Sequence, residues 1–231
     1  LKWDYYTSSF NNAFYVYLVD SNGIFAQPVQ YVGSMRASGG GDITFNSDGT
    51  KLAESDWGNL IEVYDFDRCT GMISNPVNIE MPSTTGPFKY YHSISFSPNY
   101  SYLYVLANLN AMDDVEINQY YLLTSNIQAS KTLIGTLRDS ASAVMMKLAP
   151  NGNIYISAAA SIPGSGYPYP SNLYTNVNTN LTVINYPDSA GAACDFQPYS
   201  FYLGGKRTYW GLPNNPNYEL GPLTGSICDT L

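Results

Sequence analysis

Hydrophobic and polar residues alternate along this chain in short runs, and little of it follows the period of a helix. Three segments share one order of parts: an alternating apolar run, a turn, and a second alternating run. They are Asp42–Ser55, Ser93–Ala107 and Val144–Ala158. Alternation with a period of two is typical of strands that bury one face. Their turns contain Asp-Gly, Pro-Asn or Asn-Gly, which suit tight connections. Each segment therefore predicts a β-hairpin.

The three hairpins recur at a regular spacing. Phe45, Phe96 and Leu148 hold equivalent positions, 51 and 52 residues apart. Two further strand candidates follow the first hairpin, at 59–67 and 74–81, and two follow the second, at 115–123 and 130–137. Cys194–Leu212 reads as a degenerate fourth hairpin with Gly204-Gly205 in its turn. A self-similar unit of about 50 residues and four antiparallel strands is typical of a β-propeller blade.

The sequence therefore predicts an all-β fold, a β-propeller of four-stranded antiparallel blades, in one region over residues 1–231. The expected divisions are a partial blade at 1–35, three blades at 36–87, 88–139 and 140–190, and a terminal strand pair with a tail at 191–231. The first unit reads as the last three strands of a blade, at 3–9, 12–20 and 27–34. We therefore expect a partial propeller whose missing blades precede Leu1. A β-sandwich with coincidental turns is the alternative.

Composition narrows the classes of partner. The chain has 231 residues, 45% of them apolar, 12% charged and 22 of them Tyr, with a net charge of −8. A phosphate backbone would be repelled, so we expect no nucleic-acid partner. No apolar run approaches the roughly 18 residues of a spanning helix, so we expect no membrane insertion. The N-terminus lacks the pattern of a signal peptide, which suits a cytosolic chain or a piece of an exported one.

The cysteines and the single histidine give no metal-ligand pattern. Cys194 and Cys228 bracket the C-terminal segment, and their spacing is compatible with a disulfide. Cys69 is then free or paired beyond the chain, and the sequence leaves the pairing open. None of the cysteines belongs to a C-x-x-C pair, and His92 alone does not complete a zinc set. We therefore expect no metal and no cofactor.

Several stretches resemble one family, above all "VYDFDRCTGMISNPVNI" and "GLPNNPNYELGPLTGSICDTL". They are similar to the propeller region of large secreted Bacteroidetes proteins, many of which carry a type IX secretion sorting domain or a gliding-motility-associated C-terminal domain. The resemblance implies further blades upstream and a location outside the cell or on the outer-membrane surface. It also implies an adhesin-like role and O-glycosylation of Ser140, Ser189 and Thr230, which follow Asp. It attaches no enzymatic activity to particular residues.

Candidate ligand-binding residues are aromatic. The loop Ile162–Asn176 interrupts the third blade with Pro and Gly and offers Tyr167, Tyr169 and Tyr174. Long loops on a rigid scaffold often bind ligands, although such tyrosines also pack on neighbouring blades. His92 begins an inner strand, where it would lie near the central channel or serve as a surface residue. Trp57 is assigned to packing between blades.

We assign no catalytic residue, because no Gly-x-Ser-x-Gly elbow is present and no pair of acids is fixed by spacing. Asp42 is the nearest candidate for a member of such a pair, and a surface residue at the start of a strand is the favoured alternative. The favoured function is a cell-surface module that binds glycan or protein. One alternative is a lactonase-like or glycan-cleaving propeller hydrolase, and another is a structural subunit of a filament or secretion assembly. Expected partners include the upstream part of the same protein or a secretion-system component.

Overall fold

The computed structural model describes most of the chain, and its described parts are almost entirely β-structure. The described residues are 11–36, 39–81, 90–108, 115–137, 141–160, 174–209, 211–213 and 220–221. Within them lie sixteen strands, one short helix, α1 (Asn176–Thr179), and two 3-10 turns, η1 (Gln128–Ser130) and η2 (Gly191–Cys194). No helix within these ranges is both long enough and apolar enough to span a bilayer.

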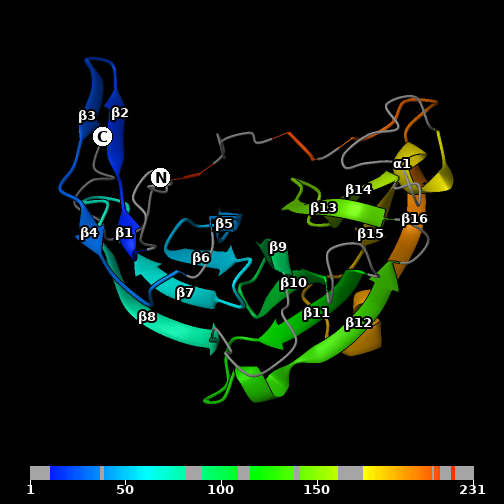
Figure 1. Cartoon of the computed structure of the whole chain (residues 1–231), viewed down its shortest axis with the longest axis horizontal. Helices are drawn as coiled ribbons and strands as arrows, with labels where there is room; N and C mark the ends of the chain where they lie inside the picture. The colour runs from blue at the N-terminus through cyan, green and yellow to red at the C-terminus, as the bar shows by residue number, and fades with distance from the viewer. Residues whose placement is uncertain are drawn as a thin grey trace.

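Twelve of the strands form three four-stranded antiparallel sheets, and each sheet keeps the order of its strands in the sequence. Blade 1 consists of β5 (Gly41–Phe45), β6 (Lys51–Asp56), β7 (Ile61–Phe66) and β8 (Ile73–Glu80). Blade 2 consists of β9 (Tyr90–Phe96), β10 (Tyr102–Asn108), β11 (Val115–Tyr121) and β12 (Thr132–Leu137). Blade 3 consists of β13 (Ala141–Leu148), β14 (Ile154–Ala160), β15 (Asn180–Ile184) and β16 (Phe196–Tyr202). In Figure 1 the blades form an arc with β5, β9 and β13 toward its inside, the arrangement of a partial β-propeller.

The predicted hairpins between the first two strands of each blade are confirmed. Each turn places one residue at positive φ: Gly49 at 72°, Tyr100 at 66° and Gly152 at 83°. Each also closes with a backbone bond, for example from the N–H of Gly49 to the carbonyl of Asn46 at 3.1 Å. Glycine favours this backbone region, which explains two of the three positions. Tyr100 shows that the turn of blade 2 is fixed by its hydrogen bonds instead.

Both faces of the middle blade are buried against its neighbours. Leu103, Val105 and Ala107 on β10 belong to the core between blades 1 and 2. Tyr104 and Leu106, which alternate with them, belong to the core between blades 2 and 3. Because a strand alternates its side chains, one apolar strand supplies two interfaces. The repeat in the sequence is therefore the repeat of these interfaces.

A recurring polar contact joins the inner strands. The Ser93 hydroxyl donates to Asp42 Oδ2 at 2.6 Å, and the same oxygen accepts the backbone N–H of Ile94 at 3.3 Å. In the next blade the backbone N–H of Met146 donates to Ser93 Oγ at 3.1 Å. Asp42 and Ser93 are equivalent in the repeat, as are Ile94 and Met146. A side chain of one inner strand thus holds the backbone of the next.

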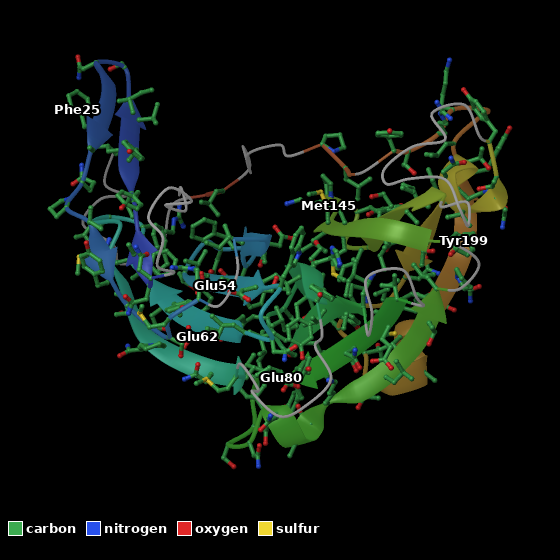
Figure 2. All side chains as sticks on the ribbon, viewed as in Figure 1. Phe25, Glu54, Glu62, Glu80, Met145 and Tyr199 are labelled. Atoms are coloured by element: carbon green, nitrogen blue, oxygen red, sulfur yellow. The ribbon has the colours of Figure 1, made fainter. Side chains whose placement is uncertain are left out.

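The N-terminal segment forms a ribbon of two successive antiparallel strand pairs. Its strands are β1 (Ala13–Phe14), β2 (Tyr17–Asp20), β3 (Gly23–Ala26) and β4 (Gln30–Tyr31), with β1 paired to β4 and β2 paired to β3. Figure 2 shows Phe25 on the part that projects from the arc. The other end packs on blade 1, where Phe14 meets Leu52, Tyr64 and Ile73. The expected strand at 3–9 lies outside the described residues.

The fourth hairpin predicted at Cys194–Leu212 is wrong. β16 pairs antiparallel with β15, with Asn180 opposite Tyr202, and is the outer strand of blade 3. Blade 3 therefore extends to Tyr202, past the expected boundary at 190. The cause is the long segment between β14 and α1, which shifts the last two strands of this blade along the sequence. An outer strand also accommodates Pro198, which has no N–H to donate.

The described residues after β16, at 203–209, 211–213 and 220–221, lie on the open side of the arc (Figure 1). Thr208 Oγ1 donates to the carbonyl of Ala158 at 2.9 Å, and the N–H of Leu212 lies 3.4 Å from Met145 Sδ. Further along, Arg68 Nη2 of blade 1 donates to the carbonyl of Gly221 at 2.8 Å. This tail therefore contacts both the last and the first complete blade.

We predict that Ser93→Ala lowers the free energy of unfolding by about 1–3 kcal/mol, because it leaves a buried N–H without its acceptor. Urea unfolding followed by circular dichroism measures this change. Ser95→Ala is the matched control: Ser95 is buried on the same strand, but within the described residues its hydroxyl bonds only the neighbouring carbonyl of Phe96. Its expected cost is below about 1 kcal/mol. Equal costs for the two variants would contradict the role of Ser93 between blades.

Candidate functional site

The strand directions define two ends of the blades. The inner strands begin at Gly41, Tyr90 and Ala141, and we call this end of the blades the entry end. Because the strands of each blade are antiparallel, β6, β10 and β14 finish at the entry end and the third strands begin there. The tight hairpins at Gly49, Tyr100 and Gly152 lie at the opposite end. The candidate ligand residues His92 and Tyr174 both belong to segments at the entry end.

Three aromatic side chains meet at the entry end, between blades 1 and 2. The ring of Trp57 lies 5.4 Å from that of His92 and 6.5 Å from that of Tyr90, measured between centroids. Trp57 is 36% exposed. We call these three residues the entry aromatic cluster. Trp57 comes from the connection between β6 and β7, whereas Tyr90 and His92 come from β9, so two blades build it.

Gly40 supports Trp57. The N–H of Trp57 donates to the carbonyl of Gly40 at 3.0 Å. A Cβ atom added to Gly40 would lie 2.2 Å from the indole ring. Only glycine therefore lets the indole ring lie this close to the backbone. The ring is held on one side by the chain while part of it stays in contact with solvent.

A β-bulge positions His92. Along β9 and β10, Leu106 pairs with Ser93 and Ala107 pairs with Tyr91, so His92 is the extra residue. An extra residue turns its side chain away from the regular alternation, and bulges often do so beside binding sites. The expectation that His92 lies on an inner strand is confirmed.

Burial lowers the pKa of His92 to about 4. Its imidazole is therefore neutral at pH 7, with one N–H donor and one acceptor nitrogen. Among the described residues, no carboxylate forms a hydrogen bond to this ring that would orient it as a general base. The cluster thus offers a neutral aromatic surface with hydrogen-bonding capacity.

Tyr174 is exposed, and none of its contacts with described residues involves the entry aromatic cluster. Its side chain is 60% exposed, and the Arg207 guanidinium lies 4.8 Å from its ring centroid. It precedes α1, at whose start the backbone N–H of Thr175 donates to Asn178 Oδ1 at 2.9 Å. Tyr167 and Tyr169 lie outside the described residues. Their role stays a prediction.

The one acidic candidate, Asp42, has structural contacts. Asp42 is engaged by Ser93 and Ile94, as described above, and is not an open acid on the axis. Across the described part of the chain, no group of three or more His, Cys, Asp or Glu side chains is placed to hold a metal ion.

Of the three glycosylation candidates, Ser189 alone lies in a described segment, while Ser140 and Thr230 do not. Ser189 is half-buried, and its carbonyl accepts Gln119 Nε2 at 2.8 Å. The neighbouring Asp188 Oδ1 accepts the N–H of Asn99 at 3.0 Å. This loop therefore packs on blade 2 at the end opposite the entry end.

The predicted Cys194–Cys228 disulfide is wrong, because Cys194 is a free, buried thiol. It belongs to the core between blades 2 and 3, where burial raises its pKa despite a hydrogen bond to Tyr104. Cys69 is instead disulfide-bonded. Cys228 lies outside the described residues.

Trp57 packs between blades 1 and 2, as the sequence predicts, but it lies at the surface rather than in the core. No motif in the sequence singles out Tyr90. Trp57 lies in Asp-Trp-Gly-Asn, a turn between two strands in which Asn59 has a φ of 71°. A large aromatic residue in such a turn is a signal that points to the surface, since turns connect strands there.

No family model matches the chain, and no curated protein matches it. Matching solved structures include the pyranose dehydrogenase PQQ domain from Coprinopsis cinerea, at 15% identity and TM-score 0.47, over 75% of this chain and 46% of that one. A Bacteroides uniformis protein provisionally named a 6-phosphogluconolactonase has 17% identity and TM-score 0.43, over 65% and 41%. The Myceliophteria thermophila Cps50 (Swd1) β-propeller domain has 8% identity and TM-score 0.37, over 62% and 42%.

This chain spans less than half the length of each of these three structures. At such identities and scores the likenesses carry no argument about activity. The assignment of a partial propeller rests on the strand order and on the arc of the three blades.

We predict that the single histidine titrates with a midpoint near pH 4 in the folded chain, against an ordinary value of 6.5. Proton NMR of the imidazole C–H signals measures it directly. Between these two pH values the unfolded chain binds the additional proton, so the contribution of His92 to stability falls as the pH drops from 6.5 toward 4. In Trp57→Ala the pKa should move back up, since the indole ring helps to bury the imidazole. A wild-type midpoint near 6.5 would contradict this burial.

Proposed function

We propose that this chain is a binding module of an extracellular propeller, and that it holds a glycan on the entry aromatic cluster without catalysing a reaction. The observation that carries the proposal is the partly exposed indole of Trp57, fixed by Gly40 and flanked by His92 and Tyr90. A rigid aromatic surface loses little conformational entropy when a ligand stacks on it.

The chemistry of the cluster supports a neutral, hydroxyl-rich ligand. A sugar ring has an apolar C–H face that stacks on an aromatic ring, and hydroxyl groups that both donate and accept hydrogen bonds. The neutral imidazole of His92 matches such groups, because it carries one donor and one acceptor. The cluster brings no cation of its own, so an anionic ligand gains little from it, and the net charge of −8 opposes such a ligand further.

The disulfide at Cys69 supports a location outside the cytosol. Disulfides form and persist in oxidising compartments and are rare in the reducing cytosol. The resemblance to secreted surface proteins agrees with this location. Within that proposal, the partner on the protein side is the upstream part of the same protein or a component of its secretion system.

The proposal predicts that purified chain binds particular oligosaccharides on a glycan array, and that Trp57→Ala weakens this binding about tenfold or more. Tenfold corresponds to about 1.4 kcal/mol, which is within the range for one lost aromatic contact. Titration of the best oligosaccharide, followed by calorimetry, measures the affinity. Tyr186→Ala is the control, because Tyr186 is 62% exposed and belongs to the loop at the opposite end of the blades.

Three outcomes would overturn the proposal. One is equal loss of affinity in Trp57→Ala and Tyr186→Ala, which would remove the cluster as the site. A second is an array with no bound glycan while a protein partner is retained through Trp57, which would favour protein recognition. The third is cleavage of the bound oligosaccharide, detected by chromatography, which would make the chain an enzyme.

A further inference from the structure

A cluster of polar side chains, separate from the entry aromatic cluster, lies buried between the N-terminal ribbon and blade 1. Its four ionisable members are almost without solvent contact: Arg36 is 6% exposed, Glu54 1%, Glu62 0% and Tyr64 1%. Figure 2 labels the two glutamates on the neighbouring strands β6 and β7, where they stand directly opposite each other in the register. Two like charges at such a position oppose strand pairing.

Arg36 forms an ion pair within this cluster. Arg36 donates to Glu54 Oε2 from Nη2 at 2.7 Å and from Nε at 3.2 Å, and its Nη1 donates to the carbonyl of Asn11 at 2.9 Å. It therefore ties blade 1 to the start of the ribbon. Glu62 instead accepts hydrogen bonds from the backbone N–H of Ser34 at 2.9 Å and from the Ser34 hydroxyl at 3.0 Å.

The Tyr64 hydroxyl lies between the two carboxylates. It is 2.8 Å from Glu54 Oε1 and 2.6 Å from Glu62 Oε2, both within hydrogen-bond distance. A phenol has a single O–H hydrogen, so it donates to one carboxylate at a time. If both glutamates are ionised, the second short contact sets two oxygen atoms together with no hydrogen between them. Buried polar atoms are rarely left in such an arrangement.

We propose that the hydrogen-bonded group Glu54–Tyr64–Glu62 holds one proton more in the folded chain than it would with both carboxylates ionised. This proton makes the attachment of the N-terminal ribbon to blade 1 dependent on pH. With that proton present, one carboxylic acid donates to the Tyr64 oxygen and Tyr64 donates to the other carboxylate. Every short contact then has a hydrogen, and Arg36 balances the one remaining negative charge. The proton belongs to the pair rather than to either residue.

The surroundings of the pair fit a proton-binding site. On β6, the buried Asp56 lies two residues after Glu54, on the same face of the strand, and it accepts the N–H of Gly58. On β7, Tyr64 lies beside Glu62. The segment before β5 contributes Ser34 and Arg36. On β8, Asn78 contacts the Ser34 hydroxyl. Arg36 is the one cation among these groups. Burial raises the pKa of Glu54, against the lowering effect of Arg36.

The proton predicts a specific pH dependence. A glutamate in the unfolded chain releases its proton near pH 4.5, whereas the folded pair keeps one above that value. Above pH 4.5 the folded state therefore binds one more proton than the unfolded state. The unfolding equilibrium constant should rise by up to tenfold per pH unit until the pair itself releases the proton. Stability from this site is therefore greatest at low pH and is lost as the pH rises.

Infrared spectroscopy of the whole folded chain at pH 7 tests the proposal. The expected result is one carboxylic acid C=O band, which shifts when the protein is made with ¹³C-labelled glutamate. Absence of that band in the wild type, or failure of the band to shift, would overturn the proposal. This measurement needs no variant, so it remains decisive even if substitutions prevent folding.

The variant Glu62→Gln supplies an amide donor toward Tyr64 and leaves Arg36 paired with Glu54. We expect it to lose the acid band and to flatten the pH dependence of urea unfolding relative to the wild type. Glu80→Gln is the control, because Glu80 accepts the hydroxyl of Tyr120 at 2.8 Å, and no second carboxylate among the described residues accepts that hydroxyl. It should keep the band and the wild-type pH dependence. A band that persists in both Glu62→Gln and Glu54→Gln would place the proton elsewhere and refute the proposal.

Discussion

The middle blade of this chain has two apolar faces, and it buries each of them against a neighbouring blade. β10 shows the constraint directly, since Val105 packs toward blade 1 while its neighbour Leu106 packs toward blade 3. An isolated sheet of this kind would expose one face or both to water. The regular spacing of the sequence, the arc of the blades and the bond from Ser93 to Asp42 all follow from the need to match successive faces.

The first face of blade 1 departs from this pattern. Glu54 stands opposite Glu62 on β6 and β7, whereas the corresponding pair on β10 and β11 is Val105 opposite Asn118. Burying charges costs free energy unless they are paired and hydrogen-bonded, so an apolar pair would be the simpler choice for adhesion alone. The polar cluster instead fixes how the ribbon meets the blade, because Arg36 and Ser34 have to reach particular oxygen atoms. This interface is therefore specific in geometry and sensitive to protons, unlike the apolar one between blades 1 and 2.

Much of the fold could be predicted from the sequence, because the hairpins are local. Alternation and turn residues are sufficient to place β5–β6, β9–β10 and β13–β14. β16 could not be placed, because its pairing with β15 depends on a long intervening segment that hides the period. The cysteine pairing failed for a related reason: Cys194 is held by the core around Tyr104, which spacing in the sequence does not reveal. His92 was found as the single histidine, but its contact with Trp57 needs two blades in position.

The candidate site depends on the same constraint as the fold. Trp57 belongs to blade 1 and His92 to blade 2, so the distance between their rings is set by how these blades dock. Near the site, that docking is fixed by Asp42 and Ser93, the latter adjacent to His92 in the chain. A ligand that contacts both rings therefore stabilises the interface between the blades, because it binds only when they are docked. A strained interface would in turn separate the rings, so stability and recognition are coupled through the inner strands.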